Sequence, residues 1–220
     1  MHFHLPKPLH GWREFAGEVG IIVLGVLIAL AADAAVEDWQ WRHKVAVVRR
    51  SLMGELGNDR ARWEVDLATS RCAMGNLDRL DRWARGNGSS AAPTSVGVEM
   101  SGNWFWMHWG NWSLATGSQA MDHLPIREQL AFAALYDGIQ HRGVEIQEAA
   151  ALVRQVQSAI LVADDATGRR ELRRAVGDLR WELDVLIHNE AYMKRRFDAV
   201  GVKPDKSDFG PDFDPNACTP

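Results

Sequence analysis

The stretch that decides the fold is VGIIVLGVLIALAA, Val19 to Ala32, which contains no polar side chain. Extended to the range Phe15–Val36, it is interrupted only by Glu18 and Asp33. At about 1.5 Å per residue, a helix of this length spans roughly 33 Å, enough to cross the roughly 30 Å hydrocarbon layer of a bilayer. The sequence therefore predicts one transmembrane helix over residues 15–36, after a short N-terminal tail at residues 1–14.

A cleaved signal peptide is the competing interpretation of this stretch. Ala29-Leu30-Ala31 fits the small-x-small pattern that precedes a signal-peptide cleavage site. Two features favour an uncleaved anchor. The preceding region is long and partly acidic, with Glu14 and Glu18, and a helical pattern continues directly after the apolar residues. We expect the anchor to be retained.

The orientation of this anchor follows from two arguments that disagree. The basic residues that flank it are Lys7 and Arg13 before the apolar stretch, and Arg42, Lys44, Arg49 and Arg50 after it. A literal count favours a cytoplasmic C-terminal domain. The short tail and the signal-like stretch suit the opposite topology, and long domains translocate largely regardless of charge. We expect a single-pass protein of the cell (inner) membrane, with its main domain on the extracytoplasmic, periplasmic side.

One face of the apolar helix carries small residues. At about 100° per residue, bulky side chains cover most of the circumference, and one stripe combines small side chains with two carboxylates. The residues of this packing face are Glu18, Gly25, Ala29, Ala32 and Asp33. Small residues let membrane helices approach closely, and carboxylates bond across such contacts. We expect it to pack on a second copy or on another membrane protein; alternatively, the carboxylates only reach the lipid headgroups and the small residues are incidental.

The segment GWREFAGEVGIIVLGVLIALAADAAVEDWQWR, Gly11 to Arg42, combines a glutamate-led anchor, a GVLIAL core and a following helix rich in Trp and Arg. It resembles the N-terminal region of a group of uncharacterised bacterial membrane proteins. A looser similarity covers WSLATGSQAMDHLPIREQLAFAALY, Trp112 to Tyr136. The resemblance implies a membrane-anchored helical protein of unknown activity, and it offers no catalytic residues to carry over.

The residues after the anchor have the periodicity of long amphipathic helices. Apolar side chains recur at intervals of three and four from Val45 to Ala84, from Leu130 to Ile160 and from Leu172 to Phe197. Helices of this length bury their apolar stripes by packing on one another. We therefore predict an all-α fold, in which residues 37–199 form an antiparallel helical bundle of three long helices and a short one.

Turn-forming residues predict where these helices end. A loop rich in Gly, Ser and Pro covers residues 86–102. The sequence DDATG at Asp164–Gly168 ends the next long helix, and either Asp165 or Thr167 is available as the N-cap of the helix that follows. Residues 200–220 contain four of the eight prolines and little periodicity, which predicts a flexible C-terminal tail.

A second unusual stretch is GNWFWMHWGNW, Gly102 to Trp112, which holds four of the ten tryptophans. On one helix these rings would spread over about 200° of the circumference, too wide for a single buried stripe. We predict an irregular or extended segment over residues 102–110, followed by a short helix over residues 111–123. The candidate aromatic binding patch is Trp104, Trp106, His108, Trp109 and Trp112. Packing in the core is the favoured role for these rings, and contact with lipid headgroups or with a partner or ligand stays open.

Composition and motifs argue against several classes of site. The net charge is −4, and the 25 basic residues are scattered among 29 acidic ones, so we expect no nucleic-acid partner. Cys72 and Cys218 are too few for a cysteine-based metal cluster, and whether they pair stays open. The histidines are not part of a nucleophile elbow, a zincin helix or a phosphate loop. We therefore expect no catalytic residue, no metal and no cofactor.

Two classes of function fit these features. The favoured one is a membrane-anchored helical interaction or scaffold protein, without catalysis, that self-associates through its transmembrane helix. It needs only the anchor with its packing face, the amphipathic helices and the aromatic cluster. The alternative is a sensor or enzyme whose small ligand enters a Trp-lined pocket in the bundle, which requires an enclosed cavity with convergent polar groups.

Overall fold

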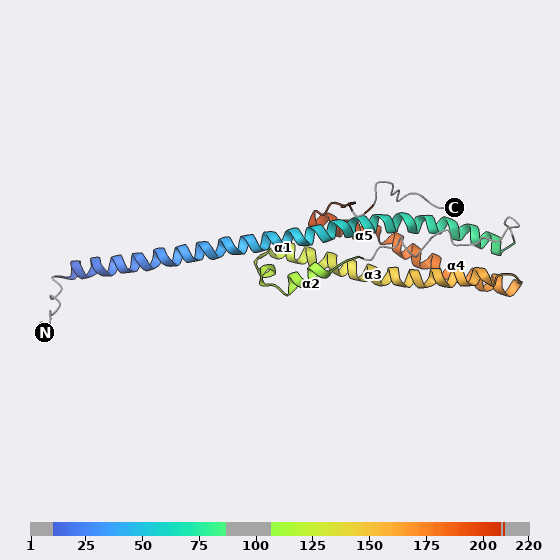
Figure 1. The fold of residues 1–220 in the computed structure, drawn as a ribbon, viewed down its shortest axis with the longest axis horizontal. Helices are drawn as coiled ribbons and strands as arrows, with labels where there is room; N and C mark the ends of the chain where they lie inside the picture. The colour runs from blue at the N-terminus through green and yellow to red at the C-terminus, as the bar shows by residue number, and fades with distance from the viewer. Residues whose placement is uncertain (1–10, 87–106, 208, 210–220) are drawn as a thin grey trace. The chain divides into compact units, whose positions relative to one another are not determined.

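A computed structural model of the chain describes residues 11–86, 107–207 and 209. These residues form helices and turns, with no strand among them. The elements are α1 (Trp12–Ala84), α2 (Gly110–Thr116), the 3-10 helix η1 (Gln119–His123), α3 (Ile126–Leu161), α4 (Ala166–His188) and α5 (Glu190–Val200) (Figure 1). The predicted all-α fold class is confirmed.

The chain divides into two units, residues 1–47 and residues 48–220. In the first unit, every residue from Gly11 to Gln40 is exposed. Within the described part of the chain, α1 is the one helix with the length and apolar composition of a membrane span, and none of its apolar window is buried. The coarse prediction of one long apolar helix near the N-terminus is therefore confirmed.

The second unit has a hydrophobic core to which three helices contribute. From Leu52 onward α1 buries its leucines, and α3 and α4 supply most of the buried apolar side chains outside α1, with smaller contributions from α2, η1 and α5. The central members are Ala73, Leu77 and Leu80 from α1, Ala149, Val153 and Val156 from α3, and Leu172, Leu179 and Leu183 from α4. Burying one leucine side chain stabilises a fold by about 1.5–3 kcal/mol. The apolar spacing that predicted these helices therefore also marks the faces that pack together.

Polar contacts in the second unit fix the direction of its helices. The pairs are Asp81–Arg173 and Arg71–Glu190 between α1 and the α4–α5 region, and Arg49–Glu128 and Glu55–Tyr136 between α1 and α3. Residue numbers rise together along α1 and α3, and they run oppositely along α1 and α4. Accordingly α1 and α3 point the same way, and α4 runs against both (Figure 1).

The turn between α3 and α4 shows why DDATG ends a helix. The Asp165 carboxylate accepts hydrogen bonds from the backbone N–H groups of Thr167 at 2.9 Å and Gly168 at 2.7 Å. Asp165 is therefore the N-cap, one of the two residues predicted for that role. A Cβ added at Gly168 would lie 2.0 Å from the carbonyl oxygen of Val162, so only glycine fits this turn.

Two boundaries differ in detail from the sequence prediction. The short helix expected over residues 111–123 is divided into α2 and η1, with a turn at residues 117 and 118. The apolar seam from Leu172 to Phe197 is interrupted at Asn189, where α4 ends and α5 begins. Periodicity did not reveal this second break, because the buried residues keep their spacing across it.

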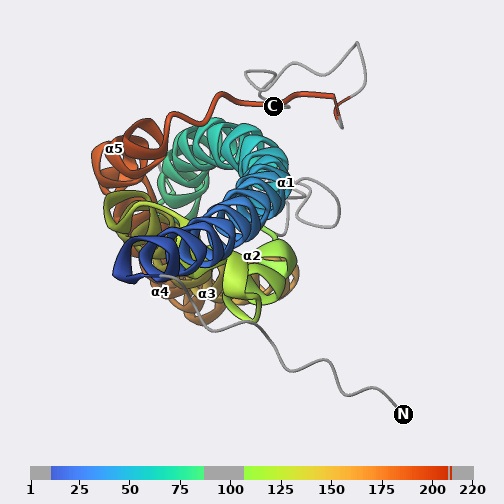
Figure 2. The same cartoon turned by 90° about the vertical axis from the view of Figure 1, so that its left-hand side faces the viewer.

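The chain after α5 is fastened to α1. Arg60 of α1 pairs with Asp198 of α5 at 2.8 Å and donates to the carbonyl oxygen of Val202 at 2.6 Å. The Asp205 backbone N–H donates to the Gly57 carbonyl oxygen at 2.9 Å. Figure 2 shows α5 beside this part of α1. Val202 is buried, and residues 203–207 are exposed, so the described start of the predicted tail follows the surface of α1.

Candidate functional site

The residues predicted to form the packing face all lie on the first part of α1. Glu18, Gly25, Ala29, Ala32 and Asp33 are exposed. A Cβ added at Gly25 would meet no atom from another part of the described chain within 4 Å. The stripe occupies an arc of about 100° around the helix, at about 100° per residue. This face is therefore exposed along its described length.

The structure places three of the five residues of the candidate aromatic patch. His108 and Trp109 lie just before α2, and Trp112 lies in α2. Trp104 and Trp106 lie outside the described residues. Met107, which precedes this group, is buried with 4 % of its surface exposed. Met107 thus attaches the chain just before α2 to the core, next to the described aromatic residues.

Two carboxylates of α1 hold the start of α2. The Asp59 carboxylate accepts the backbone N–H of His108 at 3.0 Å. The Glu55 carboxylate accepts the backbone N–H of Asn111 at 3.0 Å, in the first turn of α2. Backbone N–H groups at a helix start have no partner within the helix, so a carboxylate from a neighbouring helix is a favourable acceptor.

The indole rings of the described patch have different surroundings. Trp112 is half-buried and stacks on Tyr136 of α3, with ring centroids 4.8 Å apart. Tyr136 in turn donates its hydroxyl to Glu55 at 2.8 Å. Trp109 is 39 % exposed, and its ring lies over Gly143 of α3, 3.7 Å from where a Cβ would stand. Trp112 is therefore a packing residue, and Trp109 keeps part of its ring surface exposed.

Burial raises the pKa values of two side chains near the start of α2, Asp59 and Tyr136. Burial raises the pKa of Asp59 to about 7, and the His108 backbone N–H acts in the opposite direction. The His108 ring nitrogen Nδ1 lies 3.7 Å from the same carboxylate. Burial and the hydrogen bond to Glu55 raise the pKa of Tyr136, so its hydroxyl stays protonated and donates. The attachment of α2 is thus sensitive to pH through Asp59.

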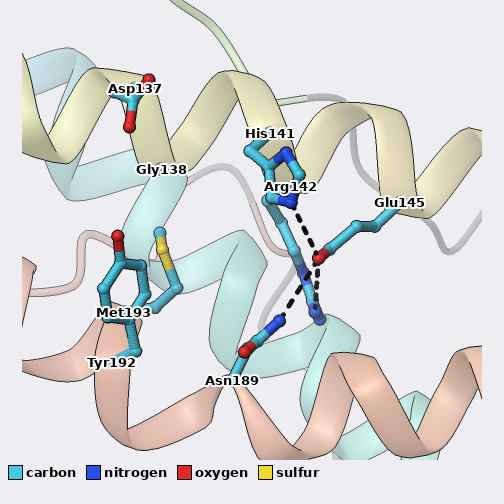
Figure 3. Close-up of a pocket in the computed structure, with 8 residues that line it drawn as sticks. All are labelled: Asp137, Gly138, His141, Arg142, Glu145, Asn189, Tyr192 and Met193. Atoms are coloured by element: carbon cyan, nitrogen blue, oxygen red, sulfur yellow. Dashed lines mark hydrogen bonds and ion pairs between the residues drawn. The ribbon is translucent and has the colours of Figure 1, made fainter.

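A pocket with several charged and polar lining residues lies where α3 meets the α4–α5 break. It has a volume of about 330 Å³, and Figure 3 shows its lining residues from α3 and α5. Three side chains converge on the Glu145 carboxylate: His141 at 3.4 Å, Arg142 at 3.6 Å and Asn189 at 3.3 Å. Asn189 is the residue at which α4 ends, so Glu145 fixes the break to α3.

Arg142 is the most deeply buried charge of this pocket, with 2 % of its surface exposed. It donates from Nη1 to the carbonyl oxygen of Leu186 at 3.0 Å, in the last turn of α4. A helix end leaves carbonyls without an internal partner, and an arginine satisfies them well. Burial lowers the pKa of Arg142, and the neighbouring Asp66 and Glu145 carboxylates offset part of this effect.

The polar groups of the pocket mainly bind one another. Asn189 donates to Glu145, His141 and Arg142 lie within ion-pair distance of it, and Arg142 donates from Nη1 to α4, so the pocket acts as a joint between helices. Among the residues that the structure describes, no tryptophan lines it. The described residues include no cluster of three or more His, Cys, Asp or Glu side chains that could hold a metal ion.

Sequence analysis missed the buried charges, although a signal for them exists. Asp59 stands between Leu56 and Trp63 on the buried face of α1, and Arg142 stands between Ile139 and Ile146 on that of α3. Charged residues at core-facing positions are rare unless they are paired. Both residues could therefore have been identified from the sequence, as charged residues at positions of the apolar repeat.

A scan against protein-family models found no match, and searches of the curated proteins and of the solved structures found no similar protein. The resemblance of residues 11–42 to anchored bacterial membrane proteins accordingly stays a prediction. The residues themselves carry the functional argument.

Proposed function

We propose that this chain is a single-pass, membrane-anchored helical interaction protein that self-associates through its transmembrane helix. The observation that carries this proposal is the contrast along α1. Its first part exposes a continuous apolar surface with a small-residue face, and its later part supplies buried residues to a folded core. An exposed apolar helix of this length is stable in lipid and costly in water.

Self-association follows from the packing face. Hydrophobic burial does not drive helices together in lipid, so close packing over small residues and bonds between polar groups supply the attraction. Gly25 and Ala29 form a small-xxx-small pair, and both are exposed. Glu18 and Asp33 lie on the same stripe, about 22 Å apart along the helix. Two copies that meet at Gly25 place these carboxylates beside the contact.

The domain formed by residues 48–200 is the part that such an anchor presents to a partner, and we place it on the periplasmic side of the inner membrane. Cys72 is disulfide-bonded, a state that persists in oxidising compartments outside the cytoplasm. Cys218, the other cysteine of the sequence, lies outside the described residues. The packed core, in which α4 runs against α1 and α3, serves in this proposal as a rigid interaction module.

Photocrosslinking inside the membrane tests the proposal. A photoreactive residue at Ala29 is expected to give a dimer of the chain, and the same residue at Leu27, about 200° around the helix, is expected to label mainly lipid. Gly25→Leu fills the face and should reduce the Ala29 dimer. Lipid adducts alone at both positions would contradict self-association, as would equal dimer yields from both positions.

A further inference from the structure

A groove between the end of α1 and α4 gathers positive charge in a chain whose net charge is −4. The groove has a volume of about 400 Å³, and its charged lining residues are Arg85, Arg170, Arg173, Arg174, Arg180 and Asp81. With Asp78, which pairs with Arg180, the region holds five arginines and two carboxylates, a net charge of +3. The negative net charge of the whole chain conceals this concentration.

The arginines of α4 share one side of the helix. At about 100° per residue, Arg170, Arg173 and Arg174 fall on the same side as Gly177, and the core residues fall on the opposite side. Trp181 lies on the arginine side with 69 % of its surface exposed. We call Arg170, Arg173, Arg174, Gly177, Arg180 and Trp181 the arginine face. It extends about 16 Å along the helix, at about 1.5 Å per residue.

The arginine face already binds carboxylates of its own chain. Asp81 accepts from Arg85 at 2.8 Å and lies 3.6 Å from Arg173. Arg170 has only the hydroxyl of Thr167, at 3.2 Å, as a hydrogen-bond acceptor among the described residues. Arg174 is exposed and forms no ion pair within the described part of the chain. Two guanidinium groups are thus available next to a place where carboxylates bind.

We propose that the arginine face is a docking surface for an acidic protein segment. The planar guanidinium group matches a carboxylate in a two-bond geometry, and Arg and Trp are the residues that most often dominate protein interfaces. A Cβ added at Gly177 would meet no atom within 4 Å. The glycine therefore leaves room for the backbone of a partner between the arginines and Trp181.

The two carboxylates decide between kinds of anionic partner. Asp78 and Asp81 pair with arginines of the arginine face. Their charges repel a partner with a uniform density of negative charge, such as a nucleic-acid backbone or an anionic bilayer surface. A protein segment with spaced carboxylates can instead contact Arg170 and Arg174 and avoid both aspartates. This inference rests on the proposed interaction function, and it adds that the partner is a protein segment with spaced carboxylates.

A binding titration with matched variants tests this surface. The full chain, in neutral phosphatidylcholine nanodiscs, is titrated with a labelled alanine-based helical peptide that carries glutamates at i, i+4 and i+7. Arg170→Glu with Arg174→Glu is expected to weaken binding by about tenfold or more. Arg154→Glu with Arg195→Glu changes the net charge equally on exposed residues elsewhere, and it should alter binding by no more than about twofold. Trp181→Ala should weaken binding by about fivefold.

Three results would overturn the docking surface. One is equal binding of the glutamate peptide and its glutamine counterpart to the unmodified chain. Another is an equal loss in both double variants, which would indicate unspecific attraction. The third is tighter binding of single-stranded oligonucleotide, or of phosphatidylglycerol vesicles, through the same arginines. Helix content by circular dichroism verifies that the variants are folded. The variants leave the Ala29 crosslink intact, so that crosslink shows whether self-association holds even where the docking surface fails.

Discussion

The first part of α1 exposes every side chain from Trp12 to Gln40, and from Leu52 onward the same helix buries its leucines. The polar residues differ in the same way. Asp59 is fully buried and bonded to His108, whereas Glu18 is exposed. The difference shows that residue type alone does not decide burial. One helix exposes its apolar side chains at one end and buries them in a protein core at the other.

The largest expected effect comes from a buried charge of the second unit. Arg142→Ala removes the donor to Leu186 and leaves Glu145 with one fewer partner, so the free energy of unfolding should fall by about 3–5 kcal/mol. Chemical denaturation in a mild detergent, followed by circular dichroism, measures this. Arg154→Ala, on an exposed position of the same helix, is the control and should change the free energy by less than about 0.5 kcal/mol. Equal effects would mean that Arg142 does not fasten α3 to α4.

Replacing one leucine in each part of α1 tests the difference in burial between the two parts. Leu77 has none of its surface exposed, so Leu77→Ala should lower the free energy of unfolding of the second unit by about 2–5 kcal/mol. Leu27, with 57 % exposed, contributes nothing to that core, and Leu27→Ala should leave the same transition unchanged. A comparable loss from both would show that the apolar residues of the first part are also packed inside the protein.

The pH dependence of stability isolates the buried carboxylate. Burial raises the pKa of Asp59 from 3.8 to about 7, so between these values the folded chain holds a proton that the unfolded chain has released. Stability therefore falls as pH rises through this window, by up to about 4 kcal/mol at about 1.4 kcal/mol per pKa unit. Asp59→Asn keeps the acceptor for His108 and removes the titration. The difference in stability between the original chain and this variant should grow from pH 4 to pH 8; a constant difference would contradict the assignment.

Two glycines of α1 give the smallest effect. Gly54 is exposed and an added Cβ meets nothing within 4 Å, so Gly54→Ala should stabilise the helix by about 1 kcal/mol. At Gly57 the same Cβ would lie 3.2 Å from the Lys203 carbonyl oxygen. Gly57→Ala should therefore be about 1 kcal/mol less favourable than Gly54→Ala. Thermal unfolding of the two variants measures the difference, and equal gains would mean that residues 203–205 do not pack on α1.

Sequence periodicity predicted the helices and much of the core, because a buried stripe must repeat every three or four residues. Leu77, Val153 and Leu179 all belong to predicted stripes and are buried. Turn chemistry predicted the N-cap at Asp165. These features are local, so the sequence contains the information directly.

Long-range partners were beyond the reach of the same patterns. The break at Asn189 depends on Glu145, which lies on another helix, and the start of α2 depends on Glu55 and Asp59. Periodicity records which residues face inward and carries no information on which charge they meet. The groove beside the arginine face has the same origin, since Arg85 joins the α4 arginines only through the fold.

An accessibility scan along α1 tests the central claim most directly. Single spin labels are placed on the full chain in nanodiscs, with Cys72 and Cys218 replaced by serine, and collision rates with oxygen and with a water-soluble nickel complex are measured. We predict that residues 19–32 are open to oxygen and closed to nickel, with an oxygen minimum at Gly25 and Ala29. From residue 49 onward, accessibility should alternate with the helical period. Nickel access throughout residues 19–32 would contradict the membrane anchor.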